Sequence, residues 1–344
     1  MSILILMATY NGAGFLREQI ESIRCQTHAD WRLLIRDDGS FDGTPELLRA
    51  LAREDSRIEL LRDHRGRLGV LANFSLLIDM AAAQGAEYVA LADQDDHWQP
   101  DKLALQTKAM ARLEASTGNA VPCLIHCDLE VVDQHMRRIS PSFVRYQGLR
   151  RPDRAPLSTC LVQNHVVGCT ILANRALLTR AAPIPNGIHM HDWWLSVCAH
   201  ALGTTRFIPL SLVRYRQHDQ NRVGARGVRG LLAKPRRWPL WLGKMGCLYR
   251  AGFYQARMLR ARWPVEPAPD LDDRRARLDG FLSQDRRSGL GRLGYLLRHR
   301  IRAQHPSLTL LFYLQSLLLS PGGHEQRAAF DLGCRERAGA PRRS

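Results

Sequence analysis

The sequence predicts an α/β fold, in which a Rossmann-like domain is followed by a basic, mainly helical extension. Three observations predict it. Short apolar runs alternate with amphipathic stretches over the first third of the chain, as strands and helices do in an α/β sheet. Polar residues directly follow three of these runs, where ligands bind in such sheets. The excess of basic residues lies entirely in the last third of the chain.

The first third of the chain alternates predicted strands and helices. Residues 3–8 read ILILMA, a continuous apolar run typical of a parallel strand buried on both faces. Helices are predicted where apolar residues recur every three or four positions, and Thr44 is expected to cap the second of them. The strands expected in this part are 3–8, 31–35, 58–61 and 88–92, and the helices are 15–27, 44–54 and 69–84.

Beyond residue 100 the pattern continues with longer polar interruptions. Residues 140–160 are rich in Pro and Arg and predict a loop, whereas residues beyond 230 show a helical, Arg-rich pattern that is broken by a linker at 264–269. The other elements expected are helices at 101–115 and 192–202 and strands at 124–132, 166–174 and 206–215. We therefore predict an α/β domain at 1–225, a basic helical extension at 226–332, and a disordered tail at 333–344.

Charge divides the chain in the same way. The 344 residues carry a net charge of +16, yet residues 1–221 hold 24 basic and 24 acidic side chains. Residues 222–344 hold 25 basic and 9 acidic side chains. Such a segment attracts polyanions, either nucleic acid or anionic lipid headgroups. Because no nucleic-acid reader motif accompanies the arginines, while aromatic residues do, attachment to a membrane surface is favoured over nucleic acid or a plain solvated extension.

The apolar stretches and the cysteines indicate in which cell compartment the protein is expected. The apolar stretch at 308–319 is 12 residues long, whereas a spanning helix needs about 20. The N-terminus shows no positively charged region before its short apolar run, so no signal peptide is expected. The eight cysteines form no CxxC pair and read as buried thiols of a reducing compartment. We expect a cytoplasmic protein, peripheral at the inner face of the cell membrane.

Three polar segments follow predicted strands and are expected to meet at one edge of the sheet: TYN at 9–11, DDGS at 37–40 and DQDD at 93–96. The glycines at 12 and 14 begin a dinucleotide fingerprint that Arg17 breaks, so a NAD-dependent oxidoreductase is disfavoured. Three carboxylates in four residues repel one another unless a cation offsets them, and Mg²⁺ or Mn²⁺ suits such oxygen ligands. The alternative for DQDD is a solvated acidic turn, with Asp96 on the dipole of the following helix.

Five motifs in register resemble the inverting glycosyltransferases of family 2. They are ATYNG at 8–12, DDGS with DGT at 37–44, DQDD at 93–96, HDWW at 191–194 and YRQH at 215–218. The last three look most like the rhamnosyltransferase branch. The resemblance implies the GT-A fold over about residues 1–222, and transfer of a sugar, best guess L-rhamnose from dTDP-rhamnose, to a glycan or lipid-linked acceptor in cell-surface polysaccharide synthesis. A UDP- or GDP-sugar donor, an inactive sugar-binding protein and a nucleic-acid-binding protein stay as alternatives.

The resemblance also implies site residues. Asp95 would hold the divalent metal, Mg²⁺ or Mn²⁺, together with His218. The segment at 65–73 resembles the family's NxGxxxA, with Arg67 in place of the usual Asn. Arg214 and Arg216 face either the diphosphate or the outside of an edge strand. The residues that match nucleotide-sugar contacts are Thr9, Tyr10, Asn11, Asp37, Asp38, Gly69, Asp93 and Asp95.

Asp192 is the candidate general base. Inverting sugar transfer needs a carboxylate to take the proton of the acceptor hydroxyl. The alternative is an N-capping Asp before a helix whose Trp193 and Trp194 belong to the core. If they do not, these tryptophans suit stacking on a sugar. The acceptor-side residues that the resemblance implies are Asp128, Gly168, Trp193 and Trp194.

Overall fold

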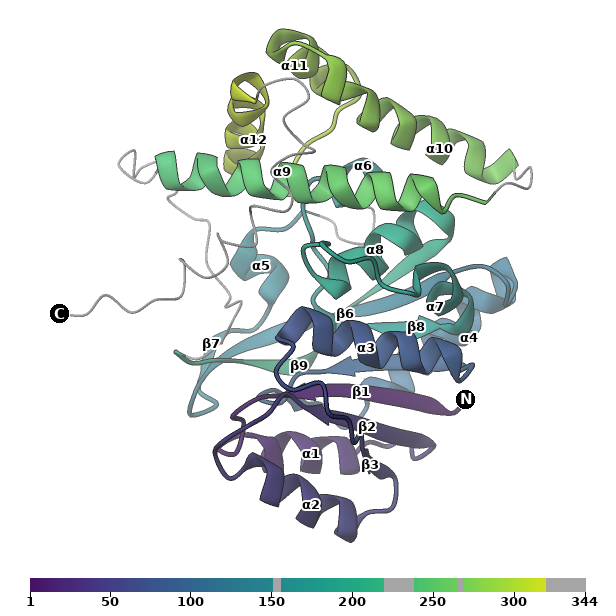
Figure 1. Cartoon of the computed structure of the whole chain (residues 1–344), viewed down its shortest axis with the longest axis vertical. Helices are drawn as coiled ribbons and strands as arrows, with labels where there is room; N and C mark the ends of the chain where they lie inside the picture. Colours follow the sequence, from purple (N-terminus) through teal and green to yellow (C-terminus); the bar gives the residue numbers. More distant parts are fainter. Residues whose placement is uncertain (151–155, 220–237, 265–268, 320–344) are drawn as a thin grey trace, which may run out of the picture. The chain divides into compact units, whose positions relative to one another are not determined.

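The computed structural model describes residues 1–150, 156–219, 238–264 and 269–319 (Figure 1). By its contacts the chain divides into two compact units. The first comprises 1–154, 166–184 and 190–227, and the second comprises 155–165, 185–189 and 228–344. The predicted domain boundaries stay predictions, and the tail predicted at 333–344 lies outside the described residues.

A nine-stranded mixed sheet is the centre of the first unit. Its strand order is β3-β2-β1-β4-β8-β6-β9-β5, and β7 pairs with β6 off this path. The pairs β3-β2, β2-β1 and β1-β4 are parallel, whereas β8 runs antiparallel to both β4 and β6. The strands are β1 (Ile3–Thr9), β2 (Trp31–Asp37), β3 (Ile58–Leu60), β4 (Tyr88–Ala92), β5 (His97–Trp98), β6 (Cys123–Asp133), β7 (Arg138–Ser140), β8 (Leu172–Asn174) and β9 (Thr204–Gln217).

Helices cover this sheet because alternate strand residues point to opposite faces. Ile3, Ile5 and Met7 of β1 pack in one cluster with Ile20 of the first helix. Leu4 and Leu6, which alternate with them along the strand, are buried on the other face of the sheet. This burial on both faces is what the continuous apolar run predicted. The helices are α1 (Leu16–Arg24), α2 (Thr44–Glu54), α3 (Val70–Ala83), α4 (Lys102–Thr117), α5 (Phe143–Gln147), α7 (Arg175–Ala181) and α8 (His191–Leu202).

Three sequence predictions fail locally. Thr44 is the first residue of α2 and does not cap it; its hydroxyl accepts a hydrogen bond from the Gly12 amide instead. Of the strand expected at 166–174 only β8 at its end is present, and a 3₁₀ turn, Gly168–Thr170, precedes it. The loop expected at 140–160 contains α5 and, in the second unit, α6 (Leu157–Cys160). Apolar composition alone did not separate these short elements from strand or loop.

The second unit is helical over its described residues. Tyr249, Phe253, Phe281 and Phe312 are buried and pack against one another at its centre. No helix in the described part of the chain is long and apolar enough to cross a membrane. The main helices are α9 (Trp238–Ala261), α10 (Pro269–Leu282), α11 (Gly289–Arg298) and α12 (Pro306–Leu318).

Candidate active site

The sheet brings the three polar segments together. Strand β1 lies between β2 and β4 and runs parallel to both, so the carboxyl ends of all three strands share one edge. Thr9 pairs in register with Asp37, and Met7 pairs with Ala92, directly before DQDD. The loops that carry the predicted site are therefore neighbours in space.

Side chains from DDGS, DGT and DQDD fix the loop after β1. The amides of Asn11, Gly12 and Ala13 donate to Ser40 Oγ, Thr44 Oγ1 and Asp42 Oδ2 at 2.8, 2.8 and 3.2 Å. Gln94 clasps the backbone of Tyr10 from the other side: its Oε1 accepts from the Tyr10 amide at 2.8 Å, and its Nε2 donates to the Tyr10 carbonyl at 3.1 Å. With these amides occupied, the glycines cannot cradle a pyrophosphate as a dinucleotide fingerprint does.

Asp37 and Asp38 have different surroundings. Asp37 is half-buried and accepts hydrogen bonds from the Thr9 hydroxyl and from Ser40. Asp38 is buried, and it accepts from the guanidinium of Arg36 and, at 2.7 Å each, from two amides, those of Leu68 and Gly69. These contacts give Asp38 a structural role, and direct nucleotide contact by Thr9 or Asp38 stays a prediction.

The exposed Arg67 stacks on the half-buried Tyr10, which follows Thr9 in the loop after β1. The Arg67 guanidinium lies 4.1 Å from the centre of the Tyr10 ring, and the exposed Phe41 ring meets the edge of Tyr10 at 6.1 Å. Gly69 has φ of 80° and precedes α3, a conformation that favours glycine. The family's Asn is absent at position 67, and the arginine that replaces it stacks on a residue predicted to contact the nucleotide.

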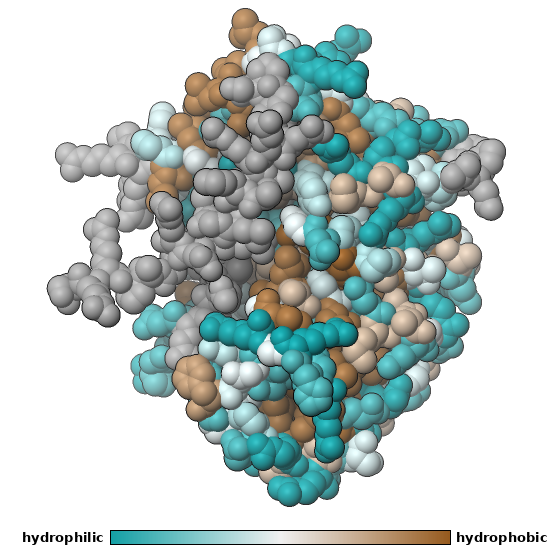
Figure 2. All heavy atoms as spheres, viewed as in Figure 1, coloured by the Kyte–Doolittle hydropathy of each residue, from teal (hydrophilic) through white to brown (hydrophobic). Residues whose placement is uncertain are grey.

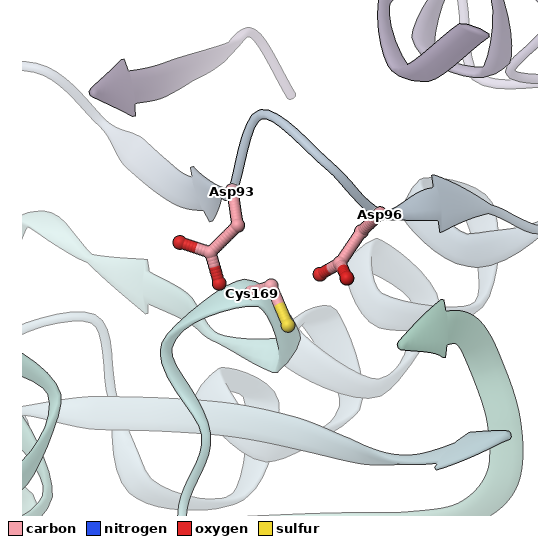
Figure 3. A group of neighbouring side chains, drawn as sticks. All are labelled: Asp93, Asp96 and Cys169. Atoms are coloured by element: carbon pink, nitrogen blue, oxygen red, sulfur yellow. The ribbon is translucent and has the colours of Figure 1, made fainter. Parts of the chain in front are cut away.

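The DQDD turn concentrates negative charge. Burial, together with the charges of Asp95 and Asp192, raises the pKa of Asp93 to about 7. Burial, together with the charges of Asp95 and Asp93, raises the pKa of Asp96 well above its usual range. Both side chains point toward Cys169, and one ligand atom from each of the three lies within 4.8 Å of the others (Figure 3). Burial also raises the pKa of the Cys169 thiol, so it stays protonated, and a protonated thiol is a poor ligand for Mg²⁺ or Mn²⁺.

Asp95 meets His218 instead. His218 Nε2 lies 2.8 Å from Asp95 Oδ2, and both side chains are largely buried. The two atoms are hydrogen-bonded to each other. Neighbouring ligands of an octahedral ion, each about 2.1 Å from it, lie about 3.0 Å apart, so a small outward shift of the two side chains would admit such an ion. The donor set, one carboxylate oxygen and one imidazole nitrogen, therefore fits a divalent cation that also binds phosphate oxygens. The sequence predicted this pair, and the structure brings its two members together over 123 positions of chain.

Arg216 holds the DQDD turn through hydrogen bonds. It is buried; its amide donates to Asp96 at 3.2 Å and its Nε donates to the Asp95 carbonyl at 2.8 Å. Its Nη1 donates to the carbonyl of Gln134 and its Nη2 to Glu18 at 2.6 Å. Arg216 was expected to face either the diphosphate or the outside of an edge strand, and neither is correct, because it lies inside the domain and holds the DQDD turn. Arg214 is partly exposed and pairs with Glu130.

Lys102 is a second buried cation below DQDD. Its Nζ lies 3.5 Å from the centre of the Trp98 ring and donates to Gln106 Oε1 at 3.1 Å. Burial lowers the pKa of Lys102 to about 8. Gln106 Nε2 in turn donates to the carbonyl of Thr170, next to Cys169. This chain links α4 to the turn that lies against Asp192, and sequence reasoning missed it because a Lys at the start of a helix is usually exposed.

Asp192 lies in the first turn of α8 and is half-buried. The N-cap of α8 is Met190, so the N-capping alternative for Asp192 does not hold; one of its oxygens accepts from the Trp193 amide at 2.6 Å. A side chain at Gly168 would begin 3.9 Å from Asp192 Oδ2, which places that glycine beside the predicted base. The negative charge of Asp192 contributes to the raised pKa of Asp93. The candidate base and the DQDD turn therefore belong to one site.

The residues predicted to contact the acceptor have different outcomes in the structure. Trp193 and Trp194 are fully buried, and Trp194 Nε1 donates to the Ala181 carbonyl, so the prediction that they stack on a sugar is wrong. Asp128 is buried and accepts from the hydroxyl of Ser142 at 2.5 Å and from the amide of Val144 at 3.1 Å. It thereby holds the start of α5, and acceptor contact by Asp128 stays a prediction. Gly168 lies beside Asp192, and acceptor contact at this glycine stays a prediction.

Comparison with known proteins decides the family. Residues 4–177 match the model described as glycosyl transferase family 2. The chain belongs to this family. The family 2 chain aligns with a solved structure of residues 1–349 of S. aureus TarS at 14% identity and a TM-score of 0.52, covering 100% of this chain and 93% of that one. This likeness shows the fold, which is of the GT-A type.

Curated relatives of this family 2 chain are distant. It is 28% identical over 231 residues to the dTDP-rhamnosyl transferase RfbG of Shigella flexneri, which covers 64% of this chain and 74% of the relative. It is 26% identical over 200 residues to the UDP-Glc:alpha-D-GlcNAc-diphosphoundecaprenol beta-1,3-glucosyltransferase WfgD of Escherichia coli, covering 56% and 68%. The names of these two relatives differ in both nucleotide and sugar.

Proposed function

We propose that this chain is an inverting, divalent-metal-dependent glycosyltransferase that transfers L-rhamnose from dTDP-rhamnose to a glycan or lipid-linked acceptor in cell-surface polysaccharide synthesis. The observation that carries the proposal is the arrangement around Asp93. The Asp95–His218 pair lies on one side of the DQDD turn, and the half-buried Asp192 lies near enough to raise the pKa of Asp93. The name of RfbG supports the choice of donor.

The residues divide the reaction between them. Asp192 takes the proton of the acceptor hydroxyl as its oxygen attacks the anomeric carbon. The bond from that carbon to the diphosphate oxygen breaks, and the nucleoside diphosphate leaves with the electron pair. Mg²⁺ or Mn²⁺ held by Asp95 and His218 would supply positive charge to the leaving diphosphate. Arg216 and Gln94 keep the DQDD turn and the Tyr10 loop in place.

A donor screen tests this function. Nucleoside diphosphate release is measured with dTDP-rhamnose, UDP-sugars and GDP-sugars, each with Mg²⁺, with Mn²⁺ and with excess chelator. The proposal expects release from dTDP-rhamnose that requires the metal. Release from a UDP- or GDP-sugar alone would move the specificity within the same enzyme class, while undiminished activity in chelator would remove the metal from the mechanism.

We also propose that the chain attaches to the anionic surface of a membrane, where a lipid-linked acceptor is presented. The charge confined to residues 222–344 supports this, since each basic residue near such a surface contributes about 1 kcal/mol. Some of its clusters, such as the one at 234–237, lie outside the described residues. Co-sedimentation of the full chain with anionic and with neutral vesicles measures the attachment, which should weaken in high salt.

A further inference from the structure

Exposed leucines concentrate in the helical unit. Nine large apolar side chains are well exposed among the described residues, and five of them, all leucines, belong to this unit. Four of the five lie on only two helices. They are Leu290 and Leu297 of α11, exposed by 78% and 53%, and Leu310 and Leu318 of α12, exposed by 43% and 69%.

Helix α11 buries one leucine and exposes two. Leu290 and Leu297 are seven positions apart and thus share one face, which is the exposed one. Leu296 is fully buried, and so is Arg292, whose guanidinium donates to the carbonyl of Leu319 just after α12. A helix in contact with water normally buries its leucines. Two well-exposed leucines on a helix that also buries an arginine indicate that the outer face of α11 meets something less polar than water.

Helix α12, which packs beside α11, also exposes leucines. It contains no charged residue, and its inner residues Leu308, Leu311 and Phe312 already fill the core of the unit. Leu310 and Leu318 therefore remain as surplus apolar surface on the outside. Helices α11 and α12 pack against each other, and apolar side chains are visible at the surface over α12 (Figure 2). We call Leu290, Leu297, Leu310 and Leu318 the leucine face.

Arginines surround the leucine face. Residues 286–319 contain six arginines and no acidic residue. One is the buried Arg292, and the other five, which flank α11, are exposed: Arg286, Arg287, Arg298, Arg300 and Arg302. A second copy of this chain would bring the same positive charges to the same face and be repelled, whereas anionic headgroups complement them. Apolar side chains with flanking arginines are what a helix at the boundary between headgroups and acyl chains presents.

We infer that the leucine face lies in the interfacial layer of an anionic phospholipid bilayer, with α11 and α12 along its surface and the exposed arginines among the headgroups. The inference deepens the proposed membrane attachment and rests on it, since it adds apolar insertion to attraction by charge. It is independent of the identity of the donor sugar.

Vesicle partitioning of leucine variants tests the inference. The full chain is compared with the double variant Leu290→Ser, Leu297→Ser on vesicles of phosphatidylglycerol and phosphatidylethanolamine, and on phosphatidylcholine alone. The matched control is Leu210→Ser, Ile139→Ser, which removes leucine or isoleucine side chains about half exposed in the other unit. Circular dichroism and thermal melting check that the variants fold. We expect the α11 double variant to lose at least about tenfold in partitioning to anionic vesicles, and the control to lose less than twofold.

Salt distinguishes insertion from charge. At 1 M salt, where the Debye length is about 3 Å, the parent chain should keep measurable binding and the α11 variant should keep none. If the α11 variant partitions like the parent at both salt concentrations, the leucine face is overturned while attachment by charge stands. If the parent does not bind anionic vesicles, both proposals fail. If the parent is a dimer in solution and the variant a monomer of equal lipid affinity, the face is a protein interface and the inference is wrong.

Discussion

At the scale of single residues, the site depends on pairs that were far apart in the sequence. Asp95 and His218 were predicted separately from two motifs, and the fold places their atoms 2.8 Å apart. Arg216 shows the limit of that reasoning, because its charge suggested substrate contact or exposure, and only the fold shows that its donors are used inside the domain.

Asp95→Asn should abolish sugar transfer, with a loss of at least about 10²-fold, because the metal loses its carboxylate ligand. The melting temperature should hardly change, since the substitution removes one of three neighbouring negative charges. Transfer and calorimetric Mn²⁺ titration in the presence of nucleoside diphosphate measure this. Asp30→Asn, remote in sequence from both motifs and with a side chain that is 62% exposed, is the control; parent-like metal affinity in Asp95→Asn would exclude the assigned ligand.

Arg216→Lys should weaken both the fold and the metal site. Lysine cannot reach the Asp95 carbonyl, the Gln134 carbonyl and Glu18 together, and each buried group left unpaired costs about 1–3 kcal/mol. Denaturant unfolding should show a loss of about 2–4 kcal/mol in the free energy of unfolding, and Mn²⁺ affinity should fall. Arg214→Lys, whose side chain is partly exposed, should change neither quantity by much; equal effects of the two variants would refute the supporting role.

At the scale of elements, the sequence predicted what depends on long, regular patterns. The strands at 3–8, 31–35 and 88–92 and the helix at 44–54 are present within two residues of their expected ends. Short elements such as β8, α5 and the 3₁₀ turn Gly168–Thr170 could not be told apart from strand or loop, because three to five residues carry too little periodicity. The antiparallel direction of β8 within the sheet has no signature in the sequence at all.

Gln94 joins two elements of the site, so its loss should act on nucleotide binding. Gln94→Ala removes both hydrogen bonds to the Tyr10 backbone and leaves that loop tied only to DDGS and DGT. We expect the affinity for nucleoside diphosphate to fall about tenfold, equivalent to the net worth of one or two hydrogen bonds. Titration calorimetry measures it, with the exposed Gln84→Ala as control. Unchanged affinity would show that the hydrogen bonds between Gln94 and the Tyr10 backbone do not order the loop after β1 for nucleotide binding.

At the scale of the whole molecule, the two units differ in which charged and apolar side chains they bury. In the first unit, Arg216 and Lys102 are buried cations that lie near the DQDD turn. The helical unit exposes arginines together with leucines. Composition predicted the basic character of the second, but which apolar residues face outward required the structure, since a leucine-rich helix pattern does not say which side is covered.

Stability should fall in mild acid, because two histidines are buried uncharged. Burial lowers the pKa of His126, also beside His200, to about 3, and burial lowers that of His191 to about 3. In the unfolded chain these histidines take up a proton near pH 6.5, whereas in the folded chain they stay uncharged down to about pH 3. The free energy of unfolding is therefore unaffected by them above pH 6.5 and falls as the pH drops from 6.5 toward 3. Each histidine costs up to about 1.4 kcal/mol per pH unit in that window.

Urea unfolding between pH 7 and pH 4.5 measures this slope. His126→Leu should flatten it, whatever its effect at pH 7, whereas His135→Gln, at an exposed position, should leave it unchanged. If the parent and His126→Leu lose free energy of unfolding at the same rate with pH, the buried histidine is not the cause.

The central claim is that Asp192 is the base of a sugar transfer whose donor binds elsewhere in the same site. The measurement that tests it most directly compares nucleotide-sugar affinity and the rate of transfer in Asp192→Asn. We predict an affinity within about threefold of the parent, since other groups hold the donor, and a transfer rate lower by about 10²–10⁴-fold, the usual cost of a lost general base. Transfer by Asp192→Asn at the parent rate would contradict the account.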